Sequence, residues 1–158
     1  MPQLILRGPG ETENLGRALA ALFAHDNPGC LLLTGDLGAG KTALAVALAR
    51  ALPGGENAEP SSPSFTICNI YCTAPQVHHF DLYRLEPGTP LDALAESFDD
   101  DAVLTVVEWP EHMAREDAPG DGVALALRPG SSETERLAEF TALGPRGRSF
   151  LFTLKQTL

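Results

Sequence analysis

The chain has 158 residues, 44% hydrophobic and 20% charged, a composition typical of one globular domain with its own core. Its formal net charge of −10 argues against independent nucleic-acid binding, which usually needs a basic face, so any RNA would be held by a partner protein. No apolar run approaches the roughly 20 residues of a membrane span, and the N-terminus lacks a signal pattern. We therefore predict a single cytoplasmic domain over residues 1–158 that does not enter a membrane.

The first elements are predicted to alternate between strand and helix. Residues 4–6 form a short apolar strand, and Thr12 has the residue type of an N-cap for the helix that follows. Asn27-Pro28-Gly29 ends this helix and leads into the apolar run at residues 31–33. This order predicts an α/β domain.

The stretch Cys30–Thr42, CLLLTGDLGAGKT, fits the pattern G-x-x-x-x-G-K-[ST] without a gap. Its glycines let backbone N–H groups converge on phosphate oxygens, and the following helix N-terminus adds partial positive charge. In this pattern Lys41 reaches the β- and γ-phosphates and the Thr42 hydroxyl ligates Mg²⁺. Because apolar residues recur at helical spacing until Pro53, the context favours a nucleoside triphosphate site over an ordinary glycine-rich turn. The predicted nucleotide-binding residues are Gly35, Asp36, Leu37, Gly38, Ala39, Gly40, Lys41 and Thr42.

The middle of the chain is predicted to contain a functional loop, a hairpin and a helix. Residues 53–64 are rich in Pro, Gly and Ser, and a long loop inside a compact domain is usually functional. Phe65–Cys72 and Val77–Leu82 predict two strands whose short link indicates an antiparallel hairpin. Thr89 as N-cap and Pro90 at the first helical position predict the next helix.

The rest of the chain is predicted to complete a sheet. Asp99-Asp100-Asp101 indicates a solvated turn rather than a cation site, and Val103–Glu108 predicts a strand covered on both faces. Two more strands are expected at Val123–Leu127 and Leu137–Leu143, around a turn at residues 128–133. Ser149–Leu158 fits a strand or a terminal helix equally well.

The cysteines are predicted to be reduced and buried rather than metal ligands. Their number is odd, and no secretion signal precedes them. Cys68 and Cys72 lie near His78 and His79, but the spacing matches no standard zinc pattern. The two histidines alternate across one predicted strand, so at most one faces the site and neither is needed as a catalyst.

Two carboxylates lie at the ends of predicted apolar strands and are the predicted partners of the phosphate loop. Glu108 ends VLTVVE and Asp81 ends VHHF, and open α/β sheets bind ligands at such strand ends. We assign Glu108 to Mg²⁺ and Asp81 to positioning water or metal, with the two roles exchangeable, and count Lys41 with them as catalytic. Surface carboxylates at strand ends are the alternative. Arg84 fits a charge stabiliser or a salt-bridge residue, and the choice stays open.

Four segments, in order, resemble the TsaE (YjeE) family. They are GDLGAGKT at 35–42, SPSFT at 62–66, HFDLYRL at 79–85 and VEWP at 107–110. The family is the small ATPase component of the bacterial machinery that makes N6-threonylcarbamoyladenosine beside the tRNA anticodon. The FDLYR and EWP elements together are specific to it, whereas a phosphate loop alone is not.

This resemblance implies a P-loop NTPase fold with a mixed, mostly parallel sheet, flanking helices and antiparallel additions. It implies ATP and Mg²⁺ as ligands, and ATP hydrolysis that is weak in the protein alone. It also implies docking on a complex of two sugar-kinase-like subunits that transfers the threonylcarbamoyl group, which ATP hydrolysis resets between turnovers. The tRNA would be reached only through these subunits.

The resemblance also assigns residues. The family's metal threonine falls on Thr42, its metal-binding acid on Glu108, its functional aspartate on Asp81 and its tryptophan on Trp109. Three more positions are candidates for contacts to the nucleotide: Thr12, Ser64 (in place of the usual threonine of S-P-T) and Arg136.

Other P-loop classes fit less well. A small-molecule or nucleoside kinase commonly closes a basic lid over the phosphates, but residues 111–122 carry one arginine among acids. A GTPase-type switch would need N-K-x-D and D-x-x-G, and neither occurs at the expected place. A degenerate loop that only holds a complex together is disfavoured because Lys41, Thr42 and both acids are present.

Overall fold

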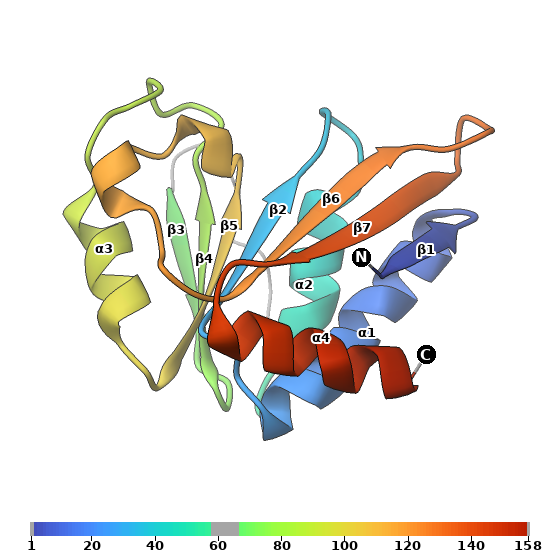
Figure 1. The fold of residues 1–158 in the computed structure, drawn as a ribbon, viewed down its shortest axis with the longest axis horizontal. Helices are drawn as coiled ribbons and strands as arrows, with labels where there is room; N and C mark the ends of the chain where they lie inside the picture. Colours follow the sequence, from blue (N-terminus) through green and yellow to red (C-terminus); the bar gives the residue numbers. More distant parts are fainter. Residues whose placement is uncertain (1, 58–66, 158) are drawn as a thin grey trace.

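The computed structural model describes residues 2–57 and 67–157, which form a seven-stranded sheet with helices on both faces (Figure 1). The strands are β1 (Gln3–Leu6), β2 (Cys30–Thr34), β3 (Cys68–Tyr71), β4 (Gln76–Asp81), β5 (Val103–Glu108), β6 (Val123–Pro129) and β7 (Arg136–Ala142). The helices are α1 (Pro9–His25), α2 (Lys41–Ala51), α3 (Asp92–Asp99), α4 (Pro145–Thr157) and the short 3-10 helices η1 (Pro110–His112) and η2 (Arg115–Asp117).

The sheet is mixed, in the order β1-β7-β6-β2-β5-β4-β3. The four central strands β6, β2, β5 and β4 are mutually parallel, whereas β7 and β1 at one edge and β3 at the other are added antiparallel. The predicted α/β fold with a mixed sheet is therefore confirmed, as is the β3–β4 hairpin. The parallel strands bring the ends of β2, β4 and β5 to one edge, where Glu108 pairs in register with both Leu33 and Asp81.

Strand alternation divides the core into two layers. Leu31 and Leu33 of β2 point into the larger layer, which α1, α2 and α4 cover; there Phe23 of α1 lies 4.9 Å from Phe150 of α4 between ring centroids. Leu32 points into the smaller layer, which α3 and the segment with η1 and η2 cover (Figure 1). All six residues of β5 are buried, as the apolar run predicts.

Helix α1 packs tightly against α2, the helix that follows the phosphate loop. A Cβ added to Gly16 would lie 2.6 Å from the Leu44 carbonyl oxygen and 3.0 Å from the Ala47 Cβ. No larger residue fits without separating the two helices, because real Cβ atoms do not approach that closely. The glycine therefore sets the position of the first turn of α2.

Two helix starts differ from their predictions. Helix α1 begins at Pro9 with Gly8 as N-cap, so Thr12 is a buried residue of its first turn rather than the cap. Proline at the first helical position already has helical φ, which favours the earlier start. Helix α3 begins at Asp92, later than the predicted start at Pro90 with Thr89 as N-cap, because Leu91 stays extended and donates its N–H to Asp117 Oδ2 at 2.8 Å.

The C-terminal region also resolves an open alternative. Residues 149–157 are helical, as part of α4. Both predicted strands before it are confirmed, but β6 and β7 extend to Pro129 and Arg136, so the turn is residues 130–135. Asp121 binds the first turn of α4 by accepting the N–H groups of Arg146 at 3.0 Å and Gly147 at 3.1 Å.

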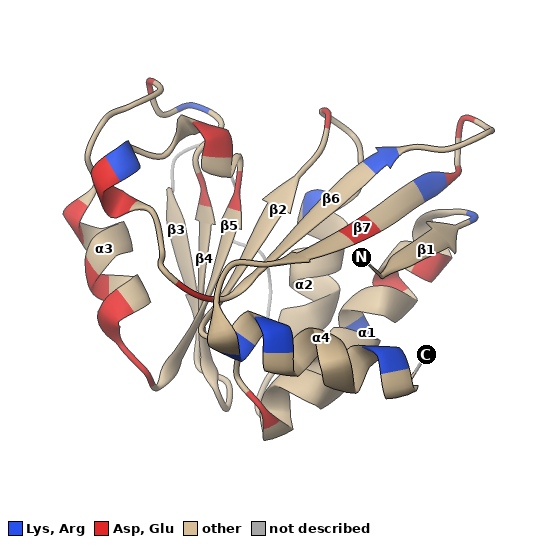
Figure 2. Cartoon of the chain, viewed as in Figure 1, with Lys and Arg blue, Asp and Glu red and all other residues tan. Residues whose placement is uncertain are grey.

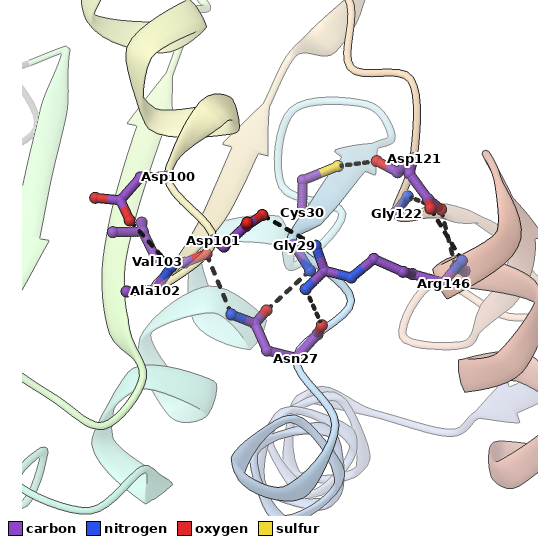
Figure 3. Close-up of polar contacts among 11 residues, drawn as sticks. Asn27, Gly29, Cys30, Asp100, Asp101, Ala102, Val103, Asp121, Gly122 and Arg146 are labelled. Carbon is purple, nitrogen blue, oxygen red and sulfur yellow. Dashed lines mark hydrogen bonds and ion pairs between the residues drawn. The ribbon is translucent and has the colours of Figure 1, made fainter.

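Arg146 joins three segments at the end of the sheet opposite the phosphate loop (Figure 3). Its Nη2 donates to the Asn27 carbonyl at 2.6 Å, and its Nη1 lies 3.7 Å from Asp101 Oδ1. The guanidinium packs over Gly29, where a Cβ would lie 3.2 Å from Nη1. Arg146 thus connects the start of α4 to the segments that precede β2 and β5.

The cysteines are unpaired, but only Cys30 is fully buried; Cys68 is partly buried and Cys72 is exposed, which corrects the prediction of buried thiols. Burial raises the pKa of Cys30 to about 12 and that of Cys68 to about 11.

His78 and His79 point to opposite faces, and no group of three or more metal-ligating side chains is gathered anywhere in residues 2–57 and 67–157. Within the same residues, no helix combines the length and apolar character that crossing a membrane requires.

Candidate functional site

The phosphate loop connects the end of β2 to the start of α2. Gly35, Gly38 and Gly40 all have positive φ, at 149°, 79° and 104°, a region that favours glycine. A Cβ on Gly35 would also lie 2.7 Å from the Leu127 carbonyl oxygen, and one on Gly40 3.1 Å from Thr12 Cγ2. The loop is thus held between β6 and α1, with the N-terminus of α2 open toward a ligand.

Lys41, the first residue of α2, is 5% exposed and bonds to its own loop. Its Nζ donates to the Gly35 carbonyl and, at 3.0 Å, to the Asp36 carbonyl. Burial lowers the pKa of Lys41, and the negative charge of nearby carboxylates, with Glu108 the largest contributor, opposes this shift. The lysine is therefore a buried cation that ligand oxygens can draw away from backbone carbonyls.

Glu108, 2% exposed, stands at the centre of a hydrogen-bonded chain. The Thr42 hydroxyl donates to Glu108 Oε2 at 3.0 Å, and His79 Nε2 lies 2.8 Å from Glu108 Oε1. Three elements contribute to this chain: α2 through the threonine, β5 through the glutamate and β4 through the histidine. The buried carboxylate is thus satisfied on both oxygens by polar partners.

Asp81 lies beside Glu108 in the β4–β5 register, and its Oδ1 accepts the Tyr83 N–H at 3.0 Å. Both carboxylates line a cavity of about 260 Å³ together with Leu37, Gly38, Ala39, Gly40, Lys41, Thr42, Ala43, Tyr83 and Trp109. The Thr42 hydroxyl and these carboxylates are hard oxygen donors at the edge of a phosphate loop. That donor set fits Mg²⁺, which typically takes one or two carboxylates and leaves its other positions to phosphates and water.

Trp109 has a left-handed backbone, with φ 58° and ψ 50°, and is the one non-glycine residue with positive φ in the part of the chain that is described. This conformation is costly for a bulky residue, the more so before a proline, and such strain concentrates at functional sites. The ring packs 4.9 Å from Tyr83 and 5.7 Å from His112 between centroids. The strained backbone turns the indole over Lys41, with Nζ 4.2 Å from the ring centroid.

The remaining predicted residues lie at different distances from the loop. Arg136 reaches it, with Nη2 3.4 Å from the Gly38 carbonyl oxygen. Thr12 packs beneath Gly40, while Arg84 is exposed beyond the end of β4 and does not line the cavity. Ser64 lies outside the described residues. Contacts of these four residues to a nucleotide or partner stay predictions.

Sequence reasoning missed the bond between His79 and Glu108. The available signal was the two-residue period of a strand, which places His79 on the same face as Asp81. The expectation that at most one histidine faces the site is confirmed, since His78 bonds instead to Ser97 Oγ and Gln76 Oε1, both at 3.0 Å. That His79 contacts the carboxylate next to Asp81 depends on strand pairing, which the sequence pattern does not specify.

A glycine loop between a parallel strand and a helix, with acids at the ends of neighbouring strands, defines the P-loop NTPase class of folds. The family model for threonylcarbamoyl adenosine biosynthesis protein TsaE matches residues 6–137 of this chain. The chain belongs to the TsaE family.

Individual relatives agree with this assignment. The tRNA threonylcarbamoyladenosine biosynthesis protein TsaE of Bacillus subtilis is 36% identical over 140 residues, which cover 87% of this chain and 84% of that protein. The protein of the same name from Nostoc is 34% identical over 147 residues, 89% of this chain and 86% of the relative. The crystal structure of B. subtilis YdiB superposes with a TM-score of 0.76 at 28% identity, covering 99% of this chain and 95% of that one.

Proposed function

We propose that this protein is a Mg²⁺-dependent ATPase that supports threonylcarbamoyl modification of the adenosine next to the tRNA anticodon. The observation that carries this proposal is the convergence of Lys41, Thr42, Asp81 and Glu108 at one edge of the parallel sheet. The relatives' names supply the pathway, since they are tRNA threonylcarbamoyladenosine biosynthesis proteins.

In the proposed reaction, backbone N–H groups of the loop and the N-terminus of α2 bind the phosphates of ATP. Lys41 exchanges the carbonyls of Gly35 and Asp36 for β- and γ-phosphate oxygens. Thr42 and Glu108 would hold Mg²⁺, whose positive charge would offset the negative charge on the phosphates. Asp81, next in register to Glu108, orients the attacking water. Arg136, at the outer side of the loop, adds positive charge near the nucleotide.

The partner is proposed to be the complex of two sugar-kinase-like subunits that transfers the threonylcarbamoyl group, which ATP hydrolysis resets between turnovers. Figure 2 shows Asp and Glu gathered on α3 and the loops near it, with Lys and Arg on α4 and at the adjoining ends of β6 and β7. With a net charge of −10, a surface of this kind suits a protein partner better than direct contact with tRNA. As the family resemblance implies, the protein alone is expected to hydrolyse ATP weakly, and it is expected to act in the cytoplasm, where tRNA is modified.

The test is a reconstituted modification assay with the two partner subunits, run for many turnovers. Lys41→Ala and Glu108→Ala are expected to reduce sustained modification at least about 100-fold. Glu13→Ala, which removes an exposed acid of α1, is the charge-matched control for Glu108→Ala and should retain sustained modification. Unimpaired turnover by Lys41→Ala or Glu108→Ala would refute the mechanism.

Two further measurements separate the alternatives. Phosphorylation of a metabolite in the absence of any partner would favour a small-molecule or nucleoside kinase. Tight and selective binding of GTP over ATP would instead favour a GTPase-type switch. Neither result is expected.

A further inference from the structure

We propose that His79 is a positioning residue that fixes the carboxylate of Glu108 for the metal. This inference rests on the proposed function, in which Glu108 helps to hold Mg²⁺. His79 itself makes no contact with ATP or the metal in this proposal; it acts through the 2.8 Å bond between its Nε2 and Glu108 Oε1.

The two oxygens of Glu108 have separate partners. Thr42 occupies Oε2 from α2, and His79 occupies Oε1 from β4. When Thr42 turns its hydroxyl oxygen to a metal, its bond to Oε2 is given up and that oxygen becomes free to face the same metal. The bond from His79 to Oε1 does not need to change. It therefore keeps one oxygen turned away from the site and presents the other in a single orientation.

The imidazole has little freedom to turn. His79 is 6% exposed, and its ring stacks on Tyr71 with centroids 6.5 Å apart and an interplanar angle of 23°. Within the described residues, its Nδ1 has no hydrogen-bond partner, and the buried Tyr71 hydroxyl also has none. Among the residues that the structure describes, the ring thus makes its one polar contact through Nε2. Leaving Nδ1 unpaired is costly for the fold, and such costs persist where a group has a role at a site.

His78, the preceding residue on the same strand, provides the contrast. Its two ring nitrogens both have side-chain partners, Ser97 and Gln76, on the face of the sheet away from Glu108. His78 therefore satisfies its own polar groups and contributes only to the fold. The two histidines form a matched pair in which only His79 contacts the acid.

The proposal separates metal binding from nucleotide binding. Removing the Nε2 donor should loosen the orientation of Glu108 without touching the loop glycines or Lys41. Loss of such an outer partner typically lowers metal affinity by about 10- to 100-fold. Metal affinity should therefore fall, while nucleotide affinity in the absence of metal should stay within about twofold of wild type.

The experiment compares His79→Gln, whose amide nitrogen can replace Nε2, with His79→Met, which is similar in length and has no donor. His79→Asn, with an amide too short to reach Glu108, is a second donor-deficient variant if His79→Met fails to fold. His78→Gln and His78→Met are the matched controls. Nucleotide affinity is first measured for each protein with a non-hydrolysable ATP analogue in EDTA. After the EDTA and unbound analogue are removed, Mn²⁺ is titrated into the nucleotide complex in place of Mg²⁺ and followed by electron paramagnetic resonance.

The expected result is an apparent Mn²⁺ dissociation constant raised about 10-fold or more in His79→Met and His79→Asn. His79→Gln and both His78 variants should stay within about threefold of wild type. Wild-type Mn²⁺ affinity in a folded His79→Met or His79→Asn protein would overturn the positioning role and leave the proposed function intact. A wild-type protein that bound neither nucleotide nor Mn²⁺ would refute the proposed function first, and this inference with it.

Discussion

The ammonium of Lys41 lies 4.2 Å from the centroid of the Trp109 ring, at a distance typical of a cation–π contact. The same ammonium donates to two carbonyls of its own loop. The lysine at the start of α2 is thus held by its own loop and covered by the ring of the strained residue after β5. In the proposed function, these contacts are exchanged for phosphate oxygens when a triphosphate binds.

Trp109 fluorescence is predicted to report this exchange. Trp109 is the only tryptophan of the 158 residues, so all tryptophan emission comes from the site. Saturating ATP should change the emission because Lys41 moves away from the ring and phosphates approach it. A fluorescence titration measures this directly. Lys41→Met should show altered basal emission and little response to ATP, whereas an unchanged wild-type spectrum at saturation would contradict the prediction.

Glu108 and Asp81 are predicted to fail in different ways when neutralised. Glu108→Gln replaces the carboxylate of the proposed Mg²⁺ ligand by a neutral amide. It should raise the Mg²⁺ concentration needed for half-maximal ATPase activity about 10-fold or more. Asp81→Asn should lower the maximal rate about 100-fold or more at any Mg²⁺ concentration, since water positioning acts on the chemical step. Steady-state kinetics with Mg²⁺ as the varied component distinguishes the two. If the two phenotypes were reversed, the roles of the acids would have to be exchanged.

Gly16→Ala is predicted to destabilise the protein although alanine is the better helix former. The added Cβ would meet the Leu44 carbonyl oxygen at 2.6 Å and push α1 from α2, at a cost of about 1–3 kcal/mol for such overpacking. Gly10, in the same helix, is the matched control because nothing lies within 4 Å of its added Cβ. Gly10→Ala should be neutral or stabilising by up to about 1 kcal/mol. Urea unfolding of both variants tests this, and equal stabilisation of both would exclude the close helix contact.

Asp121 is predicted to give a pH-dependent contribution to stability. Burial would raise the pKa of Asp121, but hydrogen bonds from the backbone N–H groups of Arg146, Gly147 and Gly122 and the charge of Arg146 outweigh it and lower the pKa. A lowered pKa in the folded state means that the ionised group stabilises the fold at neutral pH. That stabilisation is lost as the pH falls through the lowered value.

Asp121→Asn should therefore lower the free energy of unfolding by about 1–2 kcal/mol at pH 7, because the amide is uncharged and its nitrogen cannot accept a hydrogen bond from a backbone N–H group. The difference from wild type should shrink when unfolding is measured at pH values below about 4, the usual aspartate range. Asp101→Asn is the control, since Asp101 is 95% exposed and its ion pair with the same Arg146 should contribute about 0.5 kcal/mol or less. A pH-independent effect of Asp121→Asn would contradict the linkage.

Much of the fold was predictable because its signals are local. The loop glycines predict the tight phosphate loop because glycine readily adopts positive φ, and the apolar run of β5 predicts a strand buried on both faces. The starts of α1 and α3 were misplaced for opposite reasons. Pro9 acted as a local signal stronger than Thr12, whereas Leu91 is held extended by Asp117, 26 residues away. The helix of residues 149–157 was ambiguous because the cap that begins α4 comes from Asp121, in a different segment.

The sequence alone determined the phosphate loop, the two acids at strand ends and the family they indicate, because each depends on residue types at short, fixed spacing. Only the tertiary structure decided that β4 pairs with β5. This pairing brings His79 into contact with Glu108 and places Asp81 beside Glu108. It also decided that the indole of Trp109 covers Lys41. These relations join residues 27, 29 and 68 positions apart, and contacts over such distances are set by strand order and packing, which no local pattern encodes.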